Sequence, residues 1–195
     1  MPRTADFNRD KALESAMKLF WAKGYSATAL PDLLKAMGIA RSSFYASFTG
    51  KRELFIECLE LFAQRTLDGI DSWQPEQSPG YLPRAFFEST LLEAPRHRVE
   101  KGCMMVNSVL ELSEVDSELS ELASAKLDRV QALFTRAFAS AQANGQLPAD
   151  TDPEQLAQMV MTINFGLRVQ SRKSQSPEQL RSLIDNSLAM LGLAA

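Results

Sequence analysis

The sequence is poor in the side chains that most enzymes use for catalysis. Its 195 residues contain one histidine and two cysteines. A single histidine excludes most His-rich metal sites, and a serine-histidine-aspartate arrangement would rest on His97 alone, with no nucleophile elbow in the chain. A phosphate-binding Walker loop and a dinucleotide fingerprint are also missing. We therefore expect no enzyme, no catalytic residue, no metal site and no cofactor.

Long apolar runs are missing as well. No stretch is long enough to span a membrane, and the first residues, MPRTADFNRDK, lack the apolar core of a signal peptide. This predicts a cytoplasmic protein that does not interact with membranes. Cys58 and Cys103 lie far apart, so we expect no structural disulfide in a reducing compartment.

Helix signals run through the whole chain instead. Apolar residues recur at intervals of three and four, Gly24, Gly38 and Asn144-Gly145 mark stops, and Asp152-Pro153 and Ser176-Pro177 mark starts. We predict helices at about 8–23, from a cap at Thr28 onward, and at 41–48, 84–93, 103–112, 117–144, 153–170 and 177–191, with a long helix from about 51. Three prolines and a glycine predict a loop at 72–83. No segment reads as a strand, so the fold class is all-α.

Residues 28–52 carry the most informative pattern. Leu30, Leu33, Leu34 and Met37 lie on one helical face, Gly38 ends that helix, and a second short helix follows. The second helix is left with a polar and basic surface, formed by Arg41, Ser42, Ser43, Tyr45 and Ser47. A helix of this kind fits the major groove of B-DNA, where side chains of its first turn reach base edges.

Charge is distributed unevenly in a way that agrees with DNA binding. Residues 1–52 hold 9 Lys and Arg against 4 Asp and Glu, whereas the rest of the chain holds 12 against 20. The protein is acidic as a whole, yet its first quarter is basic, as phosphate binding requires. In contrast, Glu53, Glu57 and Glu60 are interpreted as a solvated helix face rather than as catalytic carboxylates.

The first 55 or so residues resemble the N-terminal domain of the TetR family (TetR/AcrR-type) of bacterial transcriptional regulators. The shared pattern is a threonine at the start of the second helix, then G-[IV]-x-x-x-x-[LF]-Y-x-x-F, then a basic residue that opens a long helix. In this chain it consists of Thr28, Gly38-Ile39, Phe44-Tyr45, Phe48 and Lys51, preceded by Ala12, Ala16, Phe20 and Gly24-Tyr25. Pro31 and Ala40 depart from the family pattern, which bears on the operator sequence rather than on DNA binding.

The resemblance implies a helix-turn-helix DNA-binding domain at 1–52 and a helical ligand-binding and dimerisation domain at 53–195. It implies that Arg41, Ser42 and Ser43 contact base edges of a double-stranded operator. The residues that it places on phosphates are Thr28, Tyr45, Ser47 and Lys51. A DNA-binding regulator is thus favoured over a helical small-molecule enzyme and over a structural adaptor.

Family members are homodimers that pair through their last two helices. Two apolar stripes in this chain have the spacing of such an interface, although the same stripes could be the core of one protomer. They consist of Leu156, Val160, Ile163 and Leu167, and of Leu180, Leu183, Ile184, Leu188 and Leu191.

The resemblance also implies a repressor that leaves DNA when a small-molecule inducer, of a class that the sequence does not reveal, enters the C-terminal domain. The helix from residue 51 would transmit the change. Residues that could line a pocket are aromatic or sulfur-containing, and core packing is the alternative for each: Phe62, Trp73, Phe86, Phe87, Met104, Met105, Phe134, Phe138, Met161 and Phe165.

Cys103 is a further candidate for a ligand-binding residue. The run from Lys101 to Glu111, K-G-C-M-x-x-N-x-x-x-E, resembles a segment of TetR-like repressors that sense electrophiles or oxidants through a cysteine. Nearby cations and the start of a helix both favour a thiolate. The alternative is a buried structural cysteine, which is also the interpretation of Cys58.

Overall fold

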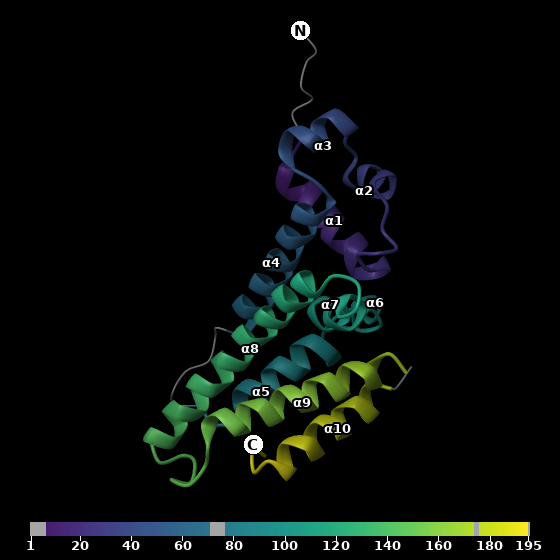
Figure 1. The fold of residues 1–195 in the computed structure, drawn as a ribbon. Coiled ribbons are helices and arrows are strands. Elements are labelled where there is room, and N and C mark those ends of the chain that lie inside the picture. The colour runs from purple at the N-terminus through teal and green to yellow at the C-terminus, as the bar shows by residue number, and fades with distance from the viewer. Residues whose placement is uncertain (1–6, 71–76, 174–175, 195) are drawn as a thin grey trace. The chain divides into compact units, whose positions relative to one another are not determined.

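The computed structural model describes residues 7–70, 77–173 and 176–194, and this part of the chain is helical without a strand (Figure 1). The all-α prediction is confirmed. The elements are α1 (Arg9–Lys23), α2 (Leu30–Met37), α3 (Arg41–Ser47), α4 (Lys51–Ile70), α5 (Tyr81–Phe87), the π-helix η1 (Glu88–Leu92), α6 (Arg96–Val99), α7 (Met104–Leu112), α8 (Ser117–Ala143), α9 (Pro153–Ser171) and α10 (Pro177–Met190). None of the described helices is long and apolar enough to cross a membrane.

The chain forms two compact units that do not follow a single cut in the sequence. Unit 1 consists of residues 1–65 and 103–126, and unit 2 of residues 66–102 and 127–195. The sequence-based boundary at residue 52 falls inside unit 1, because the start of α4, all of α7 and the first part of α8 pack with α1 to α3. The two functional domains at 1–52 and 53–195 stay a prediction.

Unit 1 is built around one apolar core. Phe20 of α1, Leu33 of α2, Phe44 of α3 and Phe55 of α4 are all buried in it, and α7 contributes Leu112. Within a helix the buried residues recur at intervals of three or four, as Ala12, Ala16 and Phe20 do in α1, so each helix turns one apolar stripe inward. This shared core fixes the three short helices against the start of α4.

The start of α2 differs from the sequence-based expectation. Its N-cap residue is Ala29, not Thr28, and the Ala29 N–H donates to the carboxylate of Asp32 at 3.3 Å. Thr28 is fully buried, and its hydroxyl donates to the carbonyl oxygen of Gly24 at 2.6 Å. Thr28 therefore stabilises the turn before α2 rather than capping the helix.

In unit 2 the predicted loop at 72–83 ends earlier than expected, because α5 already begins at Tyr81. Residues 71–76 lie outside the described part. Pro83 stands in the first turn of α5, where a backbone N–H would have no acceptor in the helix, so a proline is tolerated there. α5 continues into η1, and the short helix α6, which we did not predict, follows.

Five of the nine stripe residues predicted for a dimer interface are buried in the protomer, whereas Leu156, Ile163, Leu183 and Leu191 are half-buried, so the interface stays a prediction. Val160 and Leu167 of α9 and Leu180, Ile184 and Leu188 of α10 are all at most 4% exposed. Helical spacing identifies an apolar face but not what covers it, and here α9 and α10 pack on each other and α10 on η1. The apolar residues left on the outside are different ones: Met159, Phe165 and Val169 of α9, and Met190 of α10.

Candidate nucleic-acid interface

The helix α3 is held in place by a glycine turn and by two phenylalanines. Gly38, with φ +67°, adopts the left-handed conformation that ends α2, and its N–H donates to the carbonyl of Leu34. Phe44 and Phe48 are buried, and their rings lie 5.6 Å apart. The sequence-based placement of a glycine turn followed by a short helix at 41–48 is confirmed.

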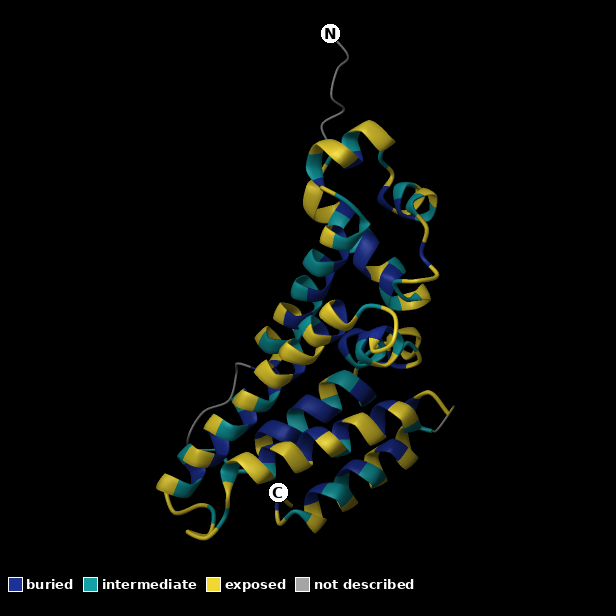
Figure 2. Cartoon of the chain, viewed as in Figure 1, coloured by how far each residue is buried: buried dark blue, intermediate teal, exposed yellow. Residues whose placement is uncertain are grey.

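One side of α3 is exposed, as Figure 2 shows. Arg41, Ser42 and Tyr45 lie on this side, and Tyr45 is 52% exposed. The Arg41 guanidinium lies over the Tyr45 ring, 5.8 Å from its centroid. This exposed side therefore combines a cation, a hydroxyl and a phenol at the start of a helix, which is the arrangement used for base edges and phosphates in a major groove.

The other predicted DNA-contacting residues have different surroundings. Ser43 and Ser47 are half-buried at the edge of α3, whereas Thr28 is fully buried. A buried hydroxyl that already donates to a backbone carbonyl does not reach a phosphate, so we exclude Thr28 from the interface. Sequence alone missed this because the family pattern fixes the residue type but not its exposure.

Lys51 opens α4 and lies half-buried against unit 1. Its Nζ is 4.3 Å from the centroid of the Tyr25 ring. Burial lowers the pKa of Lys51, and the negative charge of Glu111 opposes that shift. The amine thus remains close to the start of α4, where helix N–H groups also favour anions.

Arg9 of α1 contacts both α4 and Phe48, the residue after α3, and the sequence did not reveal this. Its guanidinium donates to the Glu57 carboxylate at 2.7 and 2.9 Å and lies 4.6 Å from the centre of the Phe48 ring. Glu60 forms an ion pair with Lys126. The Glu57 and Glu60 side chains stay 37% and 45% exposed, as expected of a solvated helix face, and their ion pairs join α4 to α1 and to α8.

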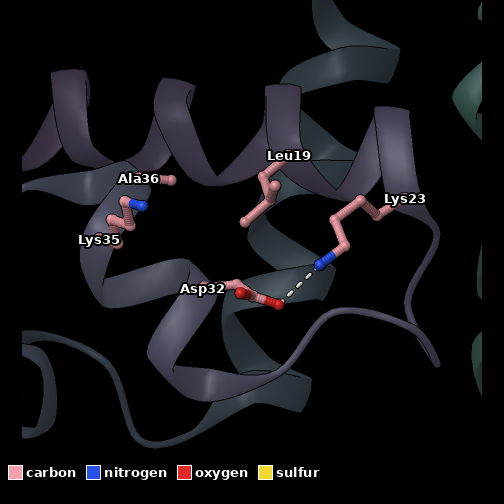
Figure 3. Close-up of a pocket in the computed structure, with 5 residues that line it drawn as sticks. All are labelled: Leu19, Lys23, Asp32, Lys35 and Ala36. Carbon is pink, nitrogen blue, oxygen red and sulfur yellow. Dashed lines mark hydrogen bonds and ion pairs between the residues drawn. The ribbon is translucent and has the colours of Figure 1, made fainter.

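A surface hollow of about 350 Å³ lies between α1 and α2 (Figure 3). It is lined by Leu19 and Lys23 of α1 and by Asp32, Lys35 and Ala36 of α2. Lys23 and Asp32 form an ion pair of 2.7 Å across it, and this hydrogen bond lowers the pKa of Asp32. Both side chains are exposed, so the pair contributes little to stability, and we assign it to the packing of α2 on α1.

The candidate ligand residues are divided between the two units. Phe62, Cys103, Met104 and Met105 belong to unit 1, where the Phe62 ring packs edge-on against Trp21 at 5.1 Å. Five of the residues that belong to unit 2 are at most 5% exposed: Phe86, Phe87, Phe134, Phe138 and Met161.

Within unit 2 the Phe134 ring lies 5.6 Å from that of Phe86 and 6.4 Å from that of Phe138. Phe165 is separate, since it is 38% exposed on α9, and Trp73 lies outside the described residues. The structure thus brings the unit 2 aromatics together as core, and a ligand pocket among them stays a prediction.

The two cysteines differ in position. Cys103 is the N-cap residue of α7 and is 5% exposed, so the prediction that it stands at a helix start is confirmed. Cys58 is fully buried in the unit 1 core, and burial raises the pKa of its thiol. His97 is exposed on α6.

A glycine turn, a packed short helix with an exposed polar and basic side, and a basic first quarter together define a helix-turn-helix protein that binds DNA. Comparison with known proteins agrees. Residues 12–58 match the family of bacterial regulatory proteins called tetR, and residues 82–186 match the tetracyclin repressor-like C-terminal domain. The chain belongs to the TetR family of transcriptional regulators, which are not enzymes.

Several relatives cover almost the whole chain. The HTH-type transcriptional repressor ComR of Escherichia coli (strain K12) is 28% identical over 186 residues, which is 94% of this chain and 89% of ComR. A solved structure of a cysteine-substituted TetR family transcriptional regulator, CifR, with 26-bp double-strand operator DNA is 31% identical, has a TM-score of 0.78 and covers 97% of this chain and 98% of that one.

The reduced form of E. coli NemR has a TM-score of 0.77 at 24% identity and covers 95% of each chain. At that identity the likeness concerns the fold alone.

Proposed function

We propose that the protein is a homodimeric repressor that binds a palindromic operator through α3 and leaves it when a small-molecule inducer binds. The observation that carries this proposal is the exposed side of α3, with Arg41, Ser42 and Tyr45 on a helix fixed by buried phenylalanines. The names of ComR and NemR as repressors, and the complex of CifR with operator DNA, support it. A protein with this task works in the cytoplasm, where bacterial DNA is.

In this proposal Arg41, Ser42 and Ser43 contact base edges, while Tyr45, Ser47 and Lys51 hold phosphates. Two α3 helices of a dimer, about one DNA turn (~34 Å) apart, would contact two inverted half-sites. The dimer interface would be formed by the outer side of α9 and the end of α10, where Met159, Phe165, Val169 and Met190 are exposed. Inducer would bind among the aromatics of unit 2.

Selection from a random duplex library tests the DNA part, because it samples all sequences and so finds the operator itself. Full-length protein is incubated with the library, and the bound duplexes are amplified and sequenced over several rounds. We expect enrichment of an inverted repeat whose half-site centres are about one turn, or ~10 bp, apart. Enrichment of no sequence, or of a single unrepeated site, would contradict a dimeric operator-binding protein.

A second function is covalent sensing through Cys103. It is supported by the position of Cys103 as the N-cap residue of α7 and by the resemblance of its segment to cysteine-sensing relatives. We expect N-ethylmaleimide at neutral pH to modify Cys103 well before Cys58, because burial keeps the Cys58 thiol protonated. Peptide mass spectrometry over a time course ranks the two.

The same reagent distinguishes a sensor from a merely reactive thiol. If Cys103 is the sensor, Cys103→Ser retains the affinity for the selected duplex but is no longer released by N-ethylmaleimide. Equal release of wild type and Cys103→Ser would leave a reversible inducer as the better account.

A further inference from the structure

The chain passes between the two units three times, and one of these passages differs from the others. It passes within α4, between Arg65 and Thr66, and within α8, between Lys126 and Leu127. The remaining passage lies outside any helix, between Gly102 and Cys103, and α7 starts directly after it. α7 is therefore a nine-residue helix that begins where the chain enters unit 1.

The far end of α7 carries a carboxylate that binds the backbone of the helix-turn-helix. Glu111 accepts hydrogen bonds from the N–H groups of Tyr25, at 3.1 Å, and of Ser26, at 2.7 Å. These residues form the turn between α1 and α2, 86 and 85 positions earlier in the chain. Hydrogen bonds to an ionised acceptor are about twice as strong as neutral ones, so this contact fixes the turn more firmly than an ordinary loop contact would.

The surroundings of Glu111 fit this carboxylate closely. Gly24, with φ +82°, has no Cβ, and a Cβ built there would overlap the Glu111 carboxylate. The Thr28 hydroxyl holds the carbonyl of the same glycine, and Lys51 covers the Tyr25 ring. The turn is thus held from α7 on one side and from within the helix-turn-helix on the other.

Further contacts attach α7 and the residues after it to the helix-turn-helix. Met104 and Leu112, at the two ends of α7, are buried in the same core as Phe20 and Phe55. Between α7 and α8, Asp116 forms an ion pair with Arg52 near the start of α4. Glu118, at the start of α8, forms a second ion pair with Arg52 at 2.5 Å.

We propose that Glu111 couples the regulatory part of the chain to DNA binding. α7 begins where the chain enters unit 1 after Gly102. A shift of α7 would move the Glu111 carboxylate, and with it the turn between α1 and α2. α2 and α3 follow that turn, so the contact is present in the DNA-binding arrangement and is weakened in the released one. This inference rests on the proposed DNA-binding function, and it adds a route that runs through α7 in addition to α4.

The test uses full-length protein and the duplex selected from the random library. Affinity is measured by fluorescence anisotropy, and exchange of the Tyr25 and Ser26 amide hydrogens by NMR, with and without the duplex. Glu111→Ala removes both acceptors, Glu111→Gln keeps one carbonyl oxygen, and Glu114→Ala is a control three residues further on, at an exposed glutamate. Circular dichroism checks that the helix content is retained.

We expect Glu111→Ala to weaken duplex binding about tenfold and to speed exchange of the two amides by a similar factor. Glu111→Gln, which keeps one acceptor, should show smaller losses of affinity and protection than Glu111→Ala, and Glu114→Ala should match wild type. Because coupling is reciprocal, the duplex should slow exchange of these amides in wild type and not in Glu111→Ala. A purely structural contact would speed exchange without this dependence on DNA.

Unchanged affinity of Glu111→Ala alongside faster amide exchange would overturn the coupling, as would wild-type exchange that ignores the duplex. If Glu111→Ala fails to fold, Glu111→Gln decides alone, since wild-type affinity with faster exchange has the same meaning. Failure of wild type to select or bind any duplex would instead contradict the proposed function, whatever the Glu111 variants do.

Discussion

At the scale of single residues, the roles depend on exposure, which the sequence does not show. The family resemblance places both Thr28 and Arg41 at the DNA, yet Thr28 is fully buried and Arg41 is exposed. The turn glycine Gly38 and the buried Phe44 could be predicted, because a helix stop and an apolar periodicity are local signals. Glu111 was visible in a motif, but its contact lies more than 80 residues away, and no spacing rule reports that.

Gly80 offers a prediction about close packing within unit 2. A Cβ at this position would overlap the carbonyl oxygen of Leu193, which is itself buried. Gly80→Ala should therefore displace the C-terminal residues and lower the free energy of unfolding by about 1–3 kcal/mol. Urea denaturation of the full chain measures it.

Gly69→Ala is the matched control for that variant. Gly69 lies in the last turn of α4, and nothing stands within 4 Å of a Cβ built there. The free energy of unfolding should rise by about 0.5–1 kcal/mol, because alanine is the better helix former. If Gly80→Ala were as stable as Gly69→Ala, the contact with Leu193 would not exist in solution.

At the scale of the helices, the presence and the ends of each helix could be predicted better than the elements that pack against it. Asp152 and Ser176 cap α9 and α10 as the sequence indicates, since a cap involves residues only two or three positions apart. The neighbours of a helical face could not be predicted from its spacing. Five of the nine stripe residues of α9 and α10 are buried in the protomer, and the large apolar residues that are exposed on these helices lie between the stripes.

The outer side of α9 gives a prediction about assembly. Phe165 and Val169 are 38% and 58% exposed, and a glutamate in an apolar interface would leave an unpaired buried charge, which costs several kcal/mol. We expect Phe165→Glu to be a folded monomer by size-exclusion chromatography with light scattering. Its affinity for the duplex should fall, because a monomer contacts only one of the two half-sites.

Leu110→Glu is the control for this substitution. Leu110 is 73% exposed on α7, which is not one of the helices of the proposed interface, so this variant should remain dimeric. Leu188→Glu differs again, because Leu188 is fully buried in the protomer and its replacement should unfold unit 2. A dimeric Phe165→Glu protein would exclude the outer side of α9 as the interface.

At the scale of the whole molecule, family and fold class could be predicted from the first 55 residues, because the helix-turn-helix motif is local and dense. The division into units could not. Unit 1 recruits residues 103–126, which complete the core around Phe20 and Phe55, and this arises from long-range packing. The protein is thus a DNA-binding regulator in which residues 103–126 complete the compact unit that contains the helix-turn-helix.

The most direct measurement of the central claim is the affinity of Arg41→Ala for the selected duplex and for an unrelated duplex, over a range of salt concentrations. Lys18→Ala is the charge-matched control. Lys18 is exposed on α1 rather than on α3, and it forms an ion pair with Glu14. We expect Arg41→Ala to lose about 1–3 kcal/mol of binding to the selected duplex and much of its preference over the unrelated one, while Lys18→Ala retains both. A folded Arg41→Ala protein that binds and discriminates like wild type would contradict α3 as the helix that recognises DNA.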